Sequence, residues 1–124
     1  MPFEVRFDEV DGIVKVRVSG LATTEDHETA RDEAFRLCRE TGCSKVLVDL
    51  RELNTGHSTT AGCYAFGTSV AQEPTAVRFA HVMPADVKSR EDVEFATTVE
   101  ANRGVLTRDF ETVDEARRWL LGHV

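Results

Sequence analysis

The stretch "KVLVDLRELNTGHSTTAG", residues 45–62, indicates the fold class of this chain. Residues 45–50 are mostly apolar and hardly alternate with polar ones, which is typical of a strand covered on both faces. Such strands lie in parallel sheets between layers of helices. A glycine-containing loop follows, and a helical pattern begins at about Ser58. We therefore expect the loop at the carboxyl end of a buried strand, where ligands of open α/β sheets bind.

Strands and helices alternate on both sides of this stretch. Apolar alternation predicts strands at 3–10 and 13–20, joined by a two-residue turn at Asp11-Gly12, and apolar runs predict further strands at 77–83 and 105–110. Helical periodicity predicts helices over 23–41, 58–72, 89–104 and from Thr112 onward. The order β-β-α-β-α-β-α-β-α predicts one α/β domain over residues 1–124, with a mixed, mostly parallel five-stranded sheet packed by helices.

Capping residues mark the ends of the predicted helices. They are Thr23 or Thr24 with Gly42 for the first helix, Ser89 with Asp92 for the third, and Thr112 with Glu115 for the last. The buried stripe of the third helix is expected to contain Phe95, Ala96 and Val99.

The composition is that of a globular protein with no affinity for nucleic acid. Apolar residues make up 41% and charged residues 30% of the 124 residues. The formal net charge of -7 leaves no basic surface for a phosphate backbone, so no nucleic-acid partner is expected. Cys38, Cys43 and Cys63 form an odd set without paired spacing, which favours free thiols in a reducing compartment over a zinc site.

The chain is expected to be cytoplasmic. Its first residues, "MPFEVRF", lack the basic start and apolar run of a signal peptide, and no apolar stretch approaches transmembrane length. Peripheral association with a membrane stays open. The first hairpin leaves a sheet edge that can pair with a second copy, so a homodimer is compatible with the sequence although no residue requires it.

The loop before Ser58 is the candidate functional site. If Ser58 caps the next helix, the backbone N–H groups after it point outward, and the helix dipole favours an anion there. Gly56 allows the backbone to turn closely. Three interpretations remain open: a bound phosphate or carboxylate, a phosphate carried by Ser58 itself, and a plain helix cap.

The helix over residues 58–72 is unusually rich in small side chains, and two glycines lower its helix propensity by roughly 2 kcal/mol. Such a helix either packs closely on the sheet or leaves a groove beside it. A groove edged by Tyr64, Phe66 and Val70, with a polar mouth at Ser58, would suit an amphipathic ligand with an anionic head. The candidate ligand- or anion-binding residues are Asn54, Gly56, His57, Ser58, Thr59, Thr60, Tyr64 and Phe66.

No residue pattern favours catalysis, a metal or another cofactor. A hydrolase-type enzyme would use His57 with Ser58 or Cys63, but catalytic triads are assembled from separate elements, and no Gly-x-Ser-x-Gly turn is present. A cysteine inside a helix is more often a small apolar core residue. His81, inside an apolar strand, is expected to be a hydrogen-bonded histidine of the core or the sheet edge. Metal-ligand spacing is absent among the histidines, which are His27, His57, His81 and His123.

Two segments carry a resemblance to a known family. The element order, with "KVLVDLRELN" as the third strand, resembles the STAS fold of anti-sigma-factor antagonists, and the closing "RDFETVDEARRWLL" is similar to their SpoIIAA-like branch. In the phosphorylated antagonists, an Asp-Ser pair follows the strand that ends in Asp-Leu, and its serine opens a helix and accepts phosphate from a partner kinase. The matching pair here is His57-Ser58, with His57 in place of Asp and Thr60 where the family usually has Gly. The resemblance to the SpoIIAA-like branch implies apolar ligands or membrane-associated partners and no reaction.

We therefore expect a non-enzymatic STAS-like domain that binds an apolar or amphipathic small ligand, or a protein partner, near the loop after the third strand. The alternative is a regulatory phosphoswitch of the anti-sigma-antagonist type with Ser58 as the phosphoacceptor. A small hydrolase that uses His57 with Ser58 or Cys63 is the least favoured hypothesis.

Overall fold

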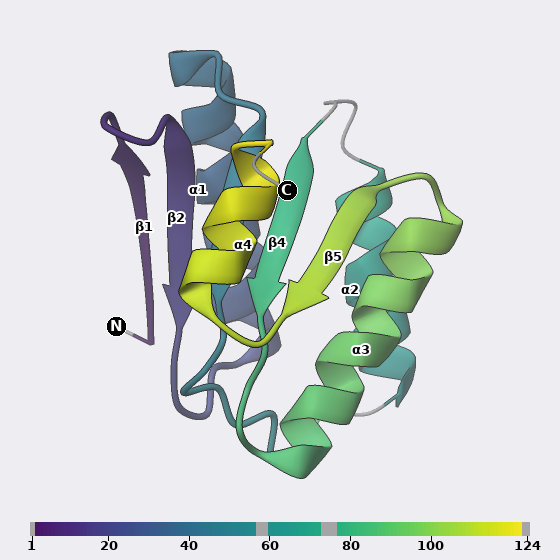
Figure 1. Cartoon of the computed structure of the whole chain (residues 1–124). Coiled ribbons are helices and arrows are strands. Elements are labelled where there is room, and N and C mark those ends of the chain that lie inside the picture. The colour runs from purple at the N-terminus through teal and green to yellow at the C-terminus, as the bar shows by residue number, and fades with distance from the viewer. Residues whose placement is uncertain (1, 57–59, 73–76, 123–124) are drawn as a thin grey trace.

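The computed structural model describes residues 2–56, 60–72 and 77–122 (Figure 1). Their element order is the predicted one, so the α/β class and the mixed, mostly parallel five-stranded sheet are confirmed. The elements are β1 (Phe3–Asp8), β2 (Ile13–Val18), α1 (Thr24–Thr41), β3 (Lys45–Asp49), α2 (Thr60–Ala71), β4 (Arg78–Val82), α3 (Val87–Asn102), β5 (Leu106–Phe110) and α4 (Val113–Leu120).

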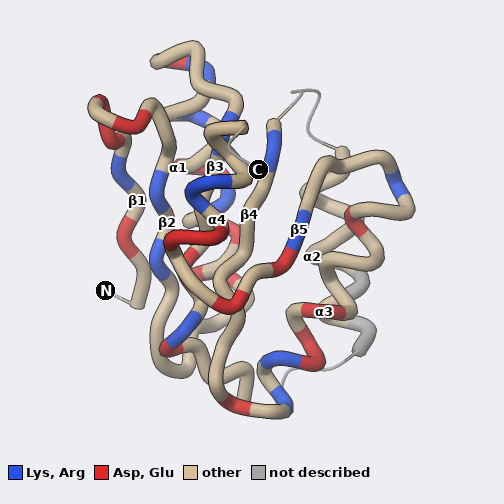
Figure 2. Tube along the Cα trace, in the orientation of Figure 1, with Lys and Arg blue, Asp and Glu red and all other residues tan. Residues whose placement is uncertain are grey.

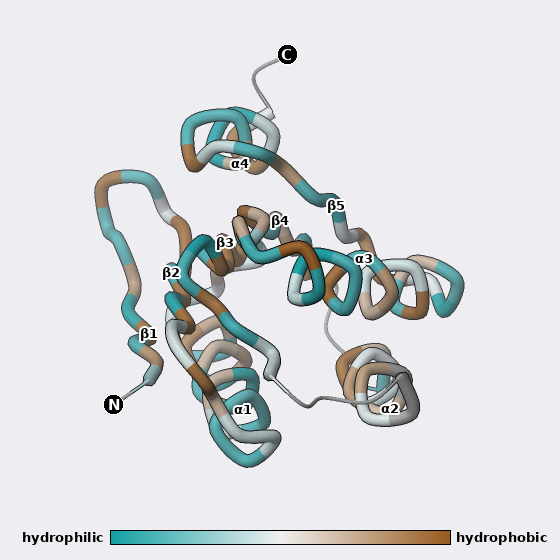
Figure 3. The backbone as a smooth tube through the Cα atoms, turned by 90° about the horizontal axis from the view of Figure 1, so that it is seen from below, coloured by the Kyte–Doolittle hydropathy of each residue, from teal (hydrophilic) through white to brown (hydrophobic). Residues whose placement is uncertain are grey.

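The strands form one five-stranded sheet in the order β1-β2-β3-β4-β5. β1 runs antiparallel to β2, and the remaining pairs are parallel. Each parallel strand joins the sheet beside the strand that precedes it, and right-handed crossovers in one direction place their helices on one face. Seen along the sheet, α1, α2 and α3 accordingly lie on one side and α4 on the other (Figure 3).

The two faces of the sheet build separate cores. On the side of α1, valines of β2 and β3 and Phe79 of β4 pack with Ala30, Ala34 and Phe35. On the side of α4, the core consists of Ile13, Leu47, Ala80, Val82, Ala116 and Leu120. β3 and β4 contribute to both cores, which explains why residues 45–50 show almost no alternation.

Caps at both ends fix the length of α1, as the sequence predicts. The hydroxyl of Thr23 accepts a hydrogen bond from the N–H of Asp26 at 3.1 Å, and the Asp26 carboxylate accepts one from the N–H of Thr23 at 2.8 Å. Gly42 ends the helix in the left-handed conformation, at φ 70°. Thr112 caps α4 through its hydroxyl, which accepts from the N–H of Glu115 at 3.1 Å and donates to the Glu115 carboxylate at 3.0 Å, in place of the backbone bond of the α1 cap.

The connection between β1 and β2 is longer than the predicted two-residue turn. Asp8 pairs with Ile13 in the sheet, so residues 9–12 form the loop. The Asp8 carboxylate accepts hydrogen bonds from the N–H groups of Val10, at 2.9 Å, and Asp11, at 3.3 Å. These side-chain bonds compete with the strand ladder and end β1 early, which sequence alternation alone does not reveal.

Helix α3 begins earlier than predicted, and its buried side differs from the predicted stripe. Asp86 is the N-cap, because its carboxylate accepts hydrogen bonds from the N–H and the hydroxyl of Ser89, at 3.0 and 2.7 Å. Phe95 is 37% exposed, whereas Ser89, Val99 and Glu100 are buried. The prediction missed a buried glutamate because it assigned apolar residues to the inner face.

Charged side chains of both signs are interleaved on the β1–β2 hairpin and α4 (Figure 2). They form ion pairs such as Arg117 with Asp11, at 2.9 Å, and Arg118 with Asp114, at 3.0 Å. Helix α2 has no charged residue. Among the described helices, none combines the length and the apolar character needed to cross a membrane.

Helix α2 packs against α3 instead of the sheet. Within the described ranges it lies on α3 and touches α1, with no comparable contact to any strand. Gly67 permits the approach to α3, because a Cβ atom there would lie 3.0 Å from the Ala96 carbonyl oxygen and 3.0 Å from Cβ of Val99. On the other side, Arg31 of α1 donates a hydrogen bond to the hydroxyl of Ser69 at 2.5 Å. These two contacts hold α2 beside α3 on the face of the sheet that α1 covers.

We expect Gly67→Ala to destabilise the protein. The methyl group must push α2 away from the α3 backbone, which costs about 1–3 kcal/mol and outweighs the gain in helix propensity of at most about 1 kcal/mol. Ala65→Gly, at an exposed position of the same helix outside the cavity lining, is the matched control and should cost about 1 kcal/mol through helix propensity alone. Urea unfolding measures both changes. A Gly67→Ala midpoint at or above the wild-type value would contradict the close α2–α3 contact.

Candidate functional site

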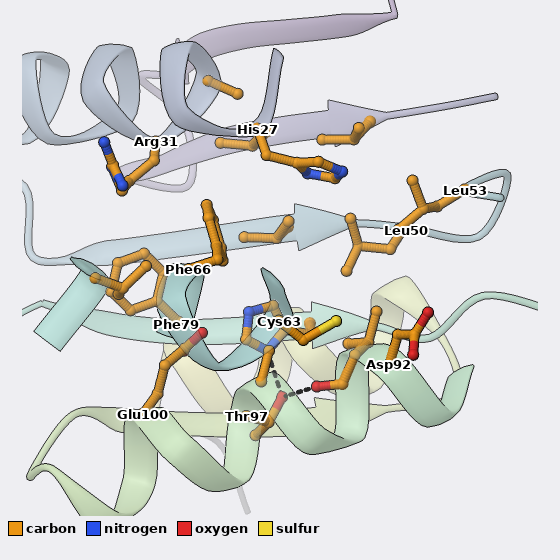
Figure 4. Close-up of a pocket in the computed structure, with 18 of the residues that line it drawn as sticks. His27, Arg31, Leu50, Leu53, Cys63, Phe66, Phe79, Asp92, Thr97 and Glu100 are labelled. Carbon is orange, nitrogen blue, oxygen red and sulfur yellow. Dashed lines mark hydrogen bonds between the residues drawn. The ribbon is translucent and has the colours of Figure 1, made fainter. Parts of the chain in front are cut away.

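A cavity of about 380 Å³ lies between the sheet and α2. Its floor is formed by β2, β3 and β4, its walls by α1 and α3, and its roof by α2 (Figure 4). Most of its lining is apolar, including Val16, Val46, Leu50, Phe66 and Phe79. The seating of α2 on α3 leaves this space above the strands, although Val70 and Phe66 of α2 still reach the core on the sheet.

The α1 wall carries His27 and Arg31, both of which contact Phe66 of the roof. The rings of His27 and Phe66 meet edge to face, with centroids 5.9 Å apart, and the Arg31 guanidinium lies 5.8 Å from the centre of the Phe66 ring. Burial lowers the pKa of His27, and Asp26 offsets only part of this effect. His27 is therefore expected to be neutral at pH 7 and to act as part of the largely apolar wall.

A polar cluster interrupts the apolar lining where β4, β5 and α3 meet. His81 of β4 lies directly opposite Asp109 of β5 in the sheet. Its Nδ1 atom is 3.2 Å from the Asp109 carboxylate and 3.3 Å from the hydroxyl of Thr107, which shares a face with Asp109 because side chains alternate along a strand. Thr97 of α3 donates to Asp109 at 2.8 Å. The predicted hydrogen-bonded core histidine is thus confirmed at His81, which is 8% exposed.

The carboxylates around His81 decide its charge. Burial alone would lower the pKa of the imidazole, but the hydrogen bond to Asp109 and the charges of Glu100 and Asp109 outweigh it, so the pKa is raised above 6.5. A histidine with this environment carries its positive charge further into the neutral range than a solvated one.

Glu100 is the second buried titratable group of the cavity. It lies near the end of α3, is 2% exposed and lines the cavity. Its Oε1 atom has no hydrogen-bond partner among the described residues. Burial raises the pKa of Glu100, and His81 and Thr107 offset part of the rise.

Cys63 faces the cavity from α2 and is a weak candidate nucleophile. Burial, followed by the charge of Asp92, raises the pKa of its thiol. The reactive form of cysteine is the thiolate, so a raised pKa disfavours reaction at pH 7. Cys38, Cys43 and Cys63 are all free thiols, as expected.

The loop after β3 is anchored to α3. The N–H of Thr55 donates to the hydroxyl of Ser89 at 2.8 Å, and the Thr55 hydroxyl donates to the Asp92 carboxylate at 2.6 Å. Leu53 pairs with Gly20 in an isolated parallel bridge that extends the β2–β3 edge. Leu50, Leu53 and Thr55 line one end of the cavity, so the predicted loop does border the candidate site.

The predicted site residues are placed as follows. Phe66 lines the cavity, and Asn54 is exposed in the adjoining loop, where its side-chain oxygen accepts a hydrogen bond from the N–H of Gly56 at 2.8 Å. His57, Ser58 and Thr59 lie outside the described residues, as do the side chains of Thr60 and Tyr64. The interpretations of Ser58 as a phosphoacceptor, an anion site or a helix cap therefore stay predictions.

Sequence reasoning missed the polar cluster and Glu100. Glu100 could have been found from its spacing. It follows Val93 and Ala96 or Thr97 at intervals of three or four residues, which places it on the inward face of the same helix. The signal for Asp109 is its alternation with Thr107 on the last strand. Only the sheet pairing shows that both strand residues face His81.

Metal binding has no support in the described part of the chain, where no three histidine, cysteine, aspartate or glutamate side chains are grouped to hold an ion. Among the fully buried side-chain oxygen and nitrogen atoms of the described residues, Oε1 of Glu100 and, outside the cavity lining, the hydroxyl oxygen of Thr68 have no hydrogen-bond partner.

Comparison with known proteins supports the fold alone. No protein-family model matches the sequence, and no curated protein matches it. The NMR structure of the protein TM1081 aligns with 94% of this chain and 86% of that chain, at a TM-score of 0.58 and 14% sequence identity. This likeness agrees with the STAS-like fold and says nothing about a ligand or a partner.

We expect the two cavity histidines to titrate on opposite sides of 6.5. In a two-dimensional NMR titration of the imidazole resonances, the pKa of His81 should lie above that value and the pKa of His27 below it. Asp109→Asn should lower the pKa of His81 and leave that of His27 unchanged. An unchanged pKa of His81 in this variant would contradict its pairing with Asp109.

The same shifts set the expected pH dependence of stability. Because the pKa of His81 is raised on folding, its contribution is fully present below pH 6.5 and is lost as the pH rises through the folded-state pKa. The contribution of His27, whose pKa is lowered, has the opposite sign. Asp109→Asn should therefore remove the loss above pH 6.5, which urea unfolding at a series of pH values would measure.

Proposed function

We propose that this protein is a non-enzymatic STAS-like domain that binds an apolar or amphipathic small molecule in the cavity beneath α2. The observation that carries the proposal is the cavity itself, which measures about 380 Å³ and is lined mainly by apolar side chains with polar and charged groups on the walls formed by α1 and α3. Small-molecule sites typically have this size and this division of apolar and polar lining.

The packing chemistry of the lining supports a ligand. Protein interiors are close-packed, and a cavity in them is stabilised by a molecule that fills it. Side chains such as Val46, Phe66 and Phe79 offer apolar surface for dispersion contacts with such a molecule. An apolar molecule would make these contacts and stabilise the folded state by mass action.

The side chains of Cys63 and His81 also favour ligand binding over catalysis. The thiol of Cys63 has a raised pKa, and Nδ1 of His81 is within hydrogen-bonding distance of Asp109 and Thr107. A nucleophilic site needs an activated nucleophile beside an available base. Neither residue meets that requirement in this arrangement.

Native mass spectrometry of gently purified protein, with a denatured control from the same sample, is the first test. We expect a mass that is lost on denaturation, because a ligand that fills the cavity should survive purification in part of the molecules. Its size should match an apolar molecule that fits about 380 Å³.

A blocked cavity provides the second test. Cys63→Phe directs a ring from α2 into the cavity and should weaken the binding of 1-octanol at least about tenfold in isothermal titration calorimetry, equivalent to about 1.4 kcal/mol. Ala65→Phe, at an exposed position of the same helix, is the control and should bind as the wild type does. A bare mass in the first experiment together with no octanol binding by the wild type would contradict the proposed function.

A further inference from the structure

One acidic atom inside the cavity lacks a partner. Glu100 is 2% exposed, and its side chain extends from α3 into the cavity in the direction of β4 (Figure 4). No described residue donates a hydrogen bond to its Oε1 atom. Leaving a buried acceptor unpaired costs about 1–3 kcal/mol, and more for a charged group, so such atoms are rare in native proteins.

The described donors near Glu100 do not reach Oε1. The hydroxyl of Thr107 hydrogen-bonds to the Glu100 carboxyl group and also lies 3.3 Å from Nδ1 of His81, which faces Asp109 at 3.2 Å. The hydroxyl of Thr97 donates to Asp109 or to the carbonyl oxygen of Val93. Oε1 therefore stays unpaired in a carboxyl group that lines the cavity.

The charges on this wall select the kind of ligand group. Asp92 and Glu100 line the cavity from α3, whereas Asp109 contacts His81 without belonging to the lining. An anionic ligand group at this wall would meet the carboxyl groups of Asp92 and Glu100. A ligand that donates a hydrogen bond can be accepted by Oε1 whether Glu100 is ionised or neutral, because an acceptor lone pair is present in both states.

We propose that the cavity selects an apolar molecule that carries one hydrogen-bond donor, a hydroxyl or an amino group, and that this group donates to Oε1 of Glu100. The inference rests on the proposed function and names the ligand class for the same cavity. The carbon skeleton lies along the valines of β2 and β3, and the donor group lies against α3. Oε1 of Glu100 thereby gains the hydrogen-bond donor that no described residue supplies.

Four eight-carbon probes separate donor, acceptor and charge in isothermal titration calorimetry at pH 7. They are 1-octanol, octylamine, methyl heptyl ether and octanoate. We expect 1-octanol or octylamine to bind about tenfold or more tightly than the ether, which has the same length and only an acceptor, and octanoate to bind most weakly. The ratio between octylamine and 1-octanol shows which donor the site takes.

Glu100→Met is the decisive variant, because it keeps the length of the side chain and removes both oxygens. It should bind 1-octanol and the ether within about twofold of each other, and its urea midpoint should rise because no unpaired acceptor is left. Glu100→Gln, which keeps an acceptor oxygen, should retain the preference for 1-octanol and lose any preference for octylamine. Glu91→Met, at an exposed position of α3, is the matched control and should keep the wild-type ratios.

The outcomes distinguish this inference from the proposed function. If the wild type binds 1-octanol and the ether equally, or octanoate most tightly, the role of Glu100 is overturned while the cavity remains a ligand site. If no probe binds, both proposals fall. A wild-type preference for 1-octanol that persists in Glu100→Met would also overturn the role of Glu100, because the donor would then pair with another group.

Discussion

The contact between Gly67 and α3 is the constraint on which the cavity depends. The hydrogen atom at Gly67 lets the α2 backbone approach the carbonyl oxygen of Ala96, so α2 is seated on a neighbouring helix instead of on the strands. Arg31 holds the other flank through Ser69. A helix fixed on both sides in this way spans the gap between α1 and α3 and leaves the floor of β2, β3 and β4 uncovered at its centre.

This arrangement couples binding to stability. α2 lacks charged residues and contains two glycines, so its helical structure depends on tertiary contacts more than on intrinsic propensity. A molecule in the cavity touches the roof as well as the floor and would supply part of those contacts. The element with the weakest intrinsic stability is therefore the one that a ligand stabilises most, which is a common property of binding sites.

The polar cluster, in contrast, places groups that prefer water inside the protein. A buried histidine and a buried glutamate lie in an apolar layer, where unpaired polar atoms destabilise the fold. The half-buried Asp109 lies within hydrogen-bonding distance of Nδ1 of His81, but Oε1 of Glu100 stays unpaired in the described structure. Local departures from good packing and pairing of this kind are expected at functional sites. The cavity and the unpaired oxygen are thus two independent departures at one place.

The sequence by itself determined the α/β class, the element order, the capping of α1 and α4, and the burial of β3 on both faces. These features follow from the periodicity of apolar residues and from side chains that bond to nearby backbone, which are local properties of the chain. It also indicated the loop after β3 as a site, because that loop ends a buried parallel strand. The tertiary structure decided where α2 sits, that a cavity lies beneath it, and that Asp109, His81 and Glu100 meet there. Those results depend on how distant segments approach one another, and one glycine contact and one strand register settle them, whereas periodicity in the sequence shows only which face of its own element a residue occupies.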